Sequence, residues 1–132
     1  MNAWKIAAAG LMVGASALVG LAAPMQPQPY SGNGDFQTYC ASCHGTSAKG
    51  DGEIAKWLTK RPADLTLLSR RNGGVFPEEK AFKSVDGRSS HSGSDMPVWA
   101  DVFAKATESA GEKNAAARIE VLVKYLETLQ VK

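Results

Sequence analysis

The two cysteines of the chain lie three positions apart and are followed directly by a histidine, as Cys40-x-x-Cys43-His44. In this order each thiol can add to a haem vinyl group and the adjacent imidazole can bind the iron, so the motif predicts covalent attachment of one c-type haem. A redox-active disulfide and half of a zinc site are the alternatives. Zinc would need two further ligands, whereas His91 is the one other histidine, and no βαβ pattern accompanies the motif as in thioredoxin-like proteins.

The N-terminal residues have the composition of an export signal. Residues 1–5 carry one positive charge, and residues 6–23 form an uncharged run rich in Ala, Gly, Leu and Val. We expect a signal peptide over residues 1–22, which predicts a periplasmic protein, because c-type haem is attached outside the bacterial cytoplasm. The run exceeds the usual signal core of about 7–15 residues and reaches the lower end of a membrane span of about 17–25 residues. An uncleaved anchor in the inner membrane is therefore the alternative.

The rest of the chain suits one small domain. Three prolines, two glutamines and two glycines between Pro24 and Gly34 indicate a spacer, which we assign to residues 23–31, with a folded domain over residues 32–132. Without Lys5 of the signal, the chain carries 14 basic and 13 acidic side chains. This near-neutral balance argues against a nucleic-acid partner or strong attraction to a membrane surface. So small a domain would gain much of its core from a haem.

Capping, breaking and periodic residues predict an all-α fold. Helices are expected at 35–44, 53–58, 65–71, 77–85 and within 97–107. Asp64 is the expected N-cap of the helix at 65–71, and Pro77 lies near the first helical position of the helix at 77–85. The clearest helix is the last one, where apolar side chains recur at helical spacing: Ile119, Leu122, Val123, Leu126 and Leu129. No segment alternates convincingly like a strand, and no internal repeat is present.

A haem iron held by His44 needs a sixth ligand or an open position. Met96 is the one methionine inside the expected domain, and Pro97 would stiffen the backbone beside it. Methionine with histidine is the usual pair in c-type cytochromes, so we expect His44 and Met96 to bind the iron. Packing of Met96 in the core is one alternative. Ligation by His91, five residues earlier in a polar loop, is the other.

The order of these features resembles a class I monohaem cytochrome c from Gly32 to Gln130. The residues that carry the resemblance are Gly32-x-x-x-Phe36, Cys40-x-x-Cys43-His44, Gly50-Asp51-Gly52, Pro62-Ala63-Asp64-Leu65-Thr66, Met96-Pro97-Val98-Trp99, Tyr125-Leu126 and Leu129. The resemblance implies short helices around one covalent haem, with the N- and C-terminal helices crossing. Gly32 and Phe36 would then pack against Tyr125.

The resemblance also implies residues that support the haem. The carbonyl of Pro62 would accept the second ring N–H of His44 and orient it. Trp99 is the expected haem contact from the second half of the chain, and the other candidates for the haem propionates are Trp57, Arg61 and Arg88. The family often has a glycine after the tryptophan of this motif, whereas Ala100 stands here.

Both axial positions would be filled, so the ligand pair predicts a one-electron carrier and not an enzyme. Its partners would be redox proteins such as a dehydrogenase, a cytochrome bc1-type complex, an oxidase or a reductase. A haem subunit of a larger oxidoreductase and a ligand-binding sensor are the alternatives. A basic cluster in the first half of the domain would either dock an acidic partner or form a solvated surface: Lys49, Lys56, Lys60, Arg61, Arg70 and Arg71.

Overall fold

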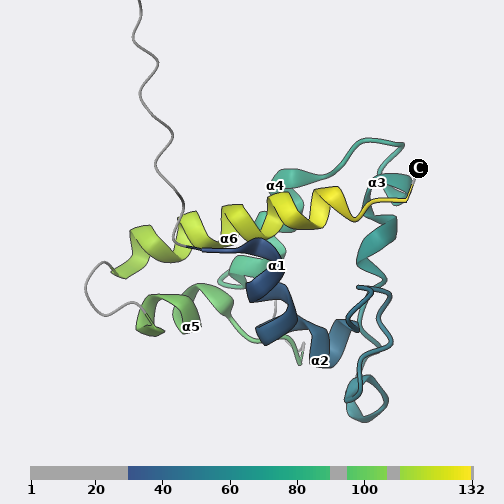
Figure 1. Cartoon of the computed structure of the whole chain (residues 1–132), viewed down its shortest axis with the longest axis horizontal. Helices are drawn as coiled ribbons and strands as arrows, with labels where there is room; N and C mark the ends of the chain where they lie inside the picture. The colour runs from purple at the N-terminus through teal and green to yellow at the C-terminus, as the bar shows by residue number, and fades with distance from the viewer. Residues whose placement is uncertain (1–29, 90–94, 107–110, 132) are drawn as a thin grey trace, which may run out of the picture.

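Helices and connecting loops make up the residues that the computed structural model describes, which are 30–89, 95–106 and 111–131, without the side chains of 111–113. These ranges hold no strand, so the all-α prediction is confirmed (Figure 1). None of the helices within them is long and apolar enough to cross a membrane. The expected signal peptide, almost all of the spacer and His91 lie outside the described residues.

The Cys40-x-x-Cys43-His44 motif ends an unbroken helical segment of three parts. Helix α1 (Gly32–Asp35) starts at Ser31, whose hydroxyl accepts the N–H of Gly34 at 3.2 Å. A π-helical stretch, η1 (Phe36–Cys40), and helix α2 (Ala41–His44) follow, with the N–H of Ala41 donating to the carbonyl of Phe36. The helix thus begins three residues before the expected position at 35. It stops where expected, at Gly45, whose φ of 81° lies in the left-handed region that favours glycine.

Short helical turns follow the motif. Residues 53–58 form only a single 3₁₀ turn, η2 (Ala55–Trp57), whereas the helix expected at 65–71 is present as η3 (Leu65–Leu67) and α3 (Leu68–Arg71). Asp64 caps it as predicted, since its carboxylate accepts the main-chain N–H of Thr66 at 2.9 Å and the Thr66 hydroxyl at 2.6 Å. Helix α4 (Glu78–Asp86) begins directly after Pro77, and α5 (Trp99–Ala106) occupies most of the expected range 97–107.

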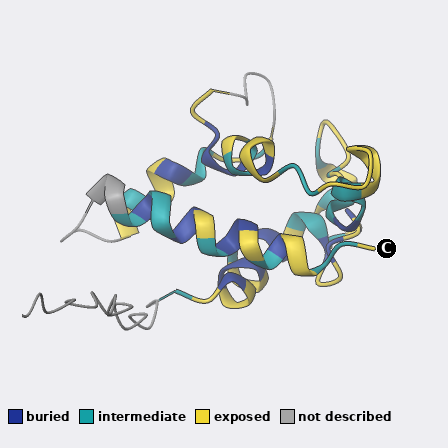
Figure 2. Cartoon of the chain, turned by 90° about the horizontal axis from the view of Figure 1, so that it is seen from above, coloured by how far each residue is buried: buried dark blue, intermediate teal, exposed yellow. Residues whose placement is uncertain are grey.

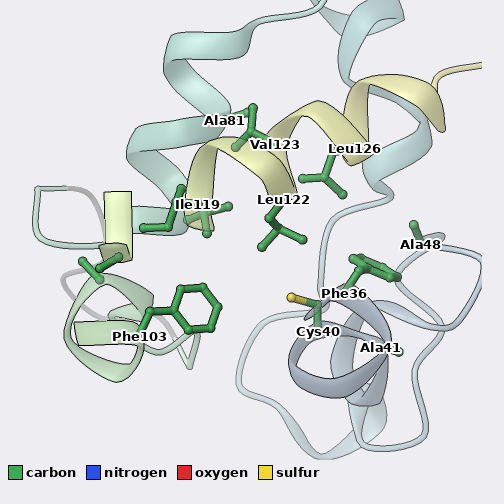
Figure 3. Close-up of a cluster of buried hydrophobic side chains, with 13 residues drawn as sticks. Phe36, Cys40, Ala41, Ala48, Ala81, Phe103, Ile119, Leu122, Val123 and Leu126 are labelled. Atoms are coloured by element: carbon green, nitrogen blue, oxygen red, sulfur yellow. The ribbon is translucent and has the colours of Figure 1, made fainter. Parts of the chain in front are cut away.

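Helix α6 (Gly111–Thr128) organises the core, because α1, α4 and α5 all pack against it (Figure 1). Buried and exposed residues alternate in bands along it, as its sequence period predicts (Figure 2). The predicted stripe is buried at Ile119, Leu122, Val123 and Leu126, while Leu129 is half-buried at the end. These side chains meet Phe36 and Phe103 in one hydrophobic cluster (Figure 3).

The crossing of α1 and α6 is close. A Cβ added to Gly32 would lie 2.6 Å from the Cβ of Tyr125, so only a glycine fits at this point. The rings of Phe36 and Tyr125 lie 5.7 Å apart between centroids. Both contacts are those that the resemblance implies. They attach the helix that carries the motif to the helix that forms the core.

The end of the chain fastens the segment 65–69 to α6. The Gln130 amide accepts the N–H of Ser69 and donates to the carbonyl of Leu65, both at 2.8 Å. The N–H of Val131 donates to the carbonyl of Thr66 at 2.9 Å. The C-terminal residues therefore fix the chain immediately after Ala63.

We predict that Gly32→Ala destabilises the protein by about 2 kcal/mol, because the added methyl overpacks the crossing of α1 and α6. Gly34→Ala is the matched control in the same helix, since its added Cβ would only approach Ser31, at 3.3 Å. That variant should be unchanged or up to about 1 kcal/mol more stable. Chemical denaturation of both variants measures the difference, and equal stabilities would contradict the close crossing.

A second prediction concerns the Asp64 cap. The hydrogen bond from the Thr66 hydroxyl is the main cause that lowers the pKa of Asp64 below its usual 3.8. A carboxyl with a lowered folded-state pKa stabilises the fold above its unfolded value and loses that contribution as pH falls through the folded value. Asp64→Ala should therefore cost about 1 kcal/mol at neutral pH. Denaturation at a series of pH values should show that the difference in the free energy of unfolding between variant and parent shrinks below pH 3.8. A difference that does not depend on pH would exclude a charged cap.

Candidate functional site

The two motif thiols lie one turn apart near the end of the first helical segment. Both cysteines are free thiols, with Cys40 buried and Cys43 half-buried. The Cys40 side chain leaves its helix on the side of Phe103 and Leu122, at the edge of the hydrophobic cluster (Figure 3). One thiol therefore points into the apolar interior and the second lies closer to solvent.

Burial determines the protonation state of the Cys40 thiol. Loss of solvent on burial raises the pKa of Cys40 to about 12, with smaller electrostatic contributions from the nearby Asp35 and Cys43. Cys40 is thus a neutral thiol near pH 7 in this fold. A neutral sulfur among apolar side chains suits a thioether better than a thiolate metal ligand, since a metal-bound cysteine must lose its proton.

His44 is oriented by a main-chain carbonyl. Its Nδ1 lies 3.0 Å from the carbonyl oxygen of Ala63, and because a carbonyl only accepts, Nδ1 must carry the proton and donate. Burial lowers the pKa of His44, and the hydrogen bond to Ala63 only partly opposes this. The ring is therefore neutral near pH 7, and Nε2 keeps a lone pair that can bind a metal.

The carbonyl that orients His44 belongs to Ala63, so the assignment of this role to Pro62 was wrong by one residue. The reason lies in the loop after the motif. The Pro62 carbonyl faces Gly50 so closely that a Cβ at that glycine would clash with it. The adjacent carbonyl of Ala63 is the one left to turn toward the imidazole. The hydrogen bond from the N–H of Leu65 to the carbonyl of Ala48, 2.8 Å long, holds the two loop segments together.

Met96 lies in the segment that leads into α5. It is half-buried and packs against the hydrophobic cluster that also contains Cys40. The carbonyl of Val98 accepts the N–H of Asp101 at 3.2 Å, which fixes the backbone two residues after Met96 as the start of the helix. Met96 as a packing residue and Met96 as an iron ligand are both compatible with this position. His91, the competing ligand, lies outside the described residues.

Trp99 belongs to an aromatic cluster. Its ring lies 5.8 Å from that of Tyr39 and 5.6 Å from that of Phe103, and it is half-buried. Trp57, by contrast, is 77% exposed, and the Lys56 ammonium lies 5.0 Å from its ring centroid. These positions place Trp99 next to the helical segment 32–44, called the motif helix below, and leave Trp57 at the surface.

The two arginines considered for the propionates, Arg61 and Arg88, are both exposed. The Arg88 guanidinium is 2.7 Å from the Asp86 carboxylate, so its charge is already balanced by a neighbour two residues away. Neither position adds support for a propionate contact.

A buried ion pair beside the motif helix could not be found from the sequence. Arg118 of α6 binds both carboxylate oxygens of Asp35, with N–O distances of 2.7 and 2.6 Å. Its guanidinium also lies 4.3 Å from the ring centroid of Phe103 and 5.1 Å from that of Tyr39. The partners are 83 residues apart, and no short motif marks them.

The described residues fit a covalently bound haem. Cys40 and Cys43 offer two thiols on one helix, His44 offers a neutral imidazole oriented by Ala63, and Met96 offers a thioether on the same hydrophobic cluster. Nitrogen with thioether sulfur is a set of axial donors known for haem iron. Within residues 30–89, 95–106 and 111–131, no group of three or more His, Cys, Asp and Glu side chains gathers into a metal site.

Comparisons with known proteins add no assignment to this geometry. No family model, no curated protein and no solved structure matches the chain.

Proposed function

We propose that the chain binds one haem covalently through Cys40 and Cys43 and carries single electrons between redox proteins. The observation that carries this proposal is the arrangement at His44. The imidazole directly follows the second thiol on the same helix, donates from Nδ1 to Ala63 and presents Nε2 with a free lone pair. In metal sites, a hydrogen bond from the ring nitrogen that does not bind the metal orients the histidine and raises its basicity.

Met96 is the proposed second axial ligand. A bound haem would supply one-electron chemistry at its iron, and a thioether ligand favours the reduced state. With both His44 and Met96 bound to the iron, small molecules such as oxygen or carbon monoxide would find no vacant position. This favours electron transfer over catalysis or ligand sensing.

The packing around the motif suits repeated electron transfer. The helical segment that carries the motif crosses α6 at Gly32 and is bound to it by the Asp35–Arg118 pair. Helix α5 also packs on α6. Side chains that are packed on several sides move little when the iron changes its oxidation state. The reorganisation energy of each electron transfer therefore stays small. A cytochrome c fold is the proposal that best combines this packing with the motif.

Export and docking complete the proposal. The signal expected over residues 1–22 would deliver the chain to the periplasm, either free or anchored to the inner membrane. The six basic residues of the first half are all exposed: Lys49, Lys56, Lys60, Arg61, Arg70 and Arg71. An acidic redox protein would be the matching partner, with association that weakens as salt rises.

We predict that the double substitution of Cys40 and Cys43 by Ala removes covalent haem and leaves little folded protein, because the core loses its largest apolar element. Ser42→Ala, an exposed position between the two thiols, is the control and should retain the haem. Mass spectrometry and thermal denaturation measure both effects. A double variant with the cooperative transition of the parent would show that the fold does not depend on the cofactor.

Met96→Ala should keep the haem bound through the thiols but open one axial position. We expect a lower reduction potential, a ferric spectrum with high-spin or water-ligated character, and rapid binding of carbon monoxide, because the thioether is gone. Potentiometry and stopped-flow absorption check these outcomes. The electron-carrier proposal is wrong if the parent already binds carbon monoxide quickly and the substitution changes neither spectrum nor potential.

A further inference from the structure

The side chain just before Met96 makes a contact across the fold that the proposed haem site does not yet explain. Asp95 accepts the main-chain N–H of Thr59 on one carboxylate oxygen at 2.7 Å and the Thr59 hydroxyl on the other at 3.3 Å. Both residues are exposed, and 36 positions separate them. Two bonds from one residue to one carboxylate fix its orientation as well as its distance.

This contact joins the two segments that would support the axial ligands. Thr59 lies four residues before Ala63, whose carbonyl orients His44. Asp95 lies next to Met96. The Asp95–Thr59 contact therefore connects the loop that sets the His44 ring with the loop that presents the thioether.

The Asp95–Thr59 contact is important because the backbone is held in place on both sides of Met96. On the C-terminal side, Val98 directly precedes α5 and its backbone packs against Gly87, where an added Cβ would lie 2.9 Å from the Val98 Cα. On the N-terminal side, the carboxylate of Asp95 is held by Thr59. A short segment fixed at both ends has few conformations to lose when its side chain binds a metal, so its ligation is favoured.

We propose that Asp95 is a positioning residue that, by holding Thr59, keeps Met96 in place as the axial ligand. The inference rests on the proposed function. Without the Asp95–Thr59 contact, the loop loses one of its two fixed points and the thioether leaves the iron more often. Small ligands then gain access during each departure. Loss of a charge-assisted hydrogen bond of this kind corresponds to about a tenfold change in such an opening equilibrium.

The test compares haem-loaded full-length variants. Asp95→Ala should bind carbon monoxide about tenfold faster than the parent, weaken the ferric absorption band that reports methionine–iron ligation, and speed hydrogen exchange at the Thr59 amide. Asp95→Asn, which keeps one carbonyl oxygen for that amide, should show a smaller effect. Thr59→Val, which removes only the hydroxyl, should also be mild. Asp101→Asn removes a nearby exposed carboxylate of α5 and should match the parent.

The outcomes separate this inference from the proposed function. If Met96→Ala abolishes the ligation band while Asp95→Ala leaves the band and the carbon monoxide rate unchanged, the positioning role is wrong and the electron carrier stands. A variant that only lowers the denaturation midpoint also overturns the role, because that result shows general stability alone. If the parent has no methionine ligation, both proposals fail together.

Discussion

The crossing of the first helical segment with α6 determines where every proposed haem-binding group lies. Glycine at position 32 lets the helices touch, and the buried pair of Asp35 and Arg118 sets their register because both carboxylate oxygens are bound. Hydrogen bonds with Asp35 are the main cause that raises the pKa of Arg118. Removing one partner of such a pair leaves an unbalanced buried charge, which costs about 3–5 kcal/mol. A shift in register would break this pair, so the motif helix has one favourable position on α6.

Contacts made by the loops fix further parts of the proposed site. The crossing places Cys40 beside the hydrophobic cluster, and the Arg118 guanidinium also lies against Phe103 of α5, the helix that begins just after Met96. Ala63 orients His44, and Gln130 fixes the chain immediately after Ala63. His44, one of the proposed metal-binding side chains, is therefore held by a main-chain carbonyl whose neighbours the C-terminal residues fix. This arrangement suits a carrier whose ligands must stay in place in both oxidation states.

Local signals in the sequence predicted most helices, and long-range contacts explain the remainder. Asp64, Gly45 and Pro77 mark their boundaries through caps and breaks that act within a few residues. The choice of Ala63 over Pro62 depends on the approach of Gly50 from a distant loop, so no local pattern could settle it. The Asp35–Arg118 and Asp95–Thr59 contacts were unforeseen for the same reason, since their partners lie 83 and 36 residues apart. The π-helical stretch that ends at Cys40 has no short sequence signature.

We propose that this chain carries one covalent haem with both axial positions of its iron filled. Protein exported from cells that attach c-type haem tests this through its intact mass and its ferric and ferrous absorption spectra. We predict a mass equal to the chain from residue 23 plus one haem, or the whole chain plus one haem if the anchor is retained. The spectra should be low-spin and unchanged by brief exposure to carbon monoxide. A chain of unmodified mass would exclude the covalent haem, and a high-spin haem that binds carbon monoxide at once would exclude two filled axial positions.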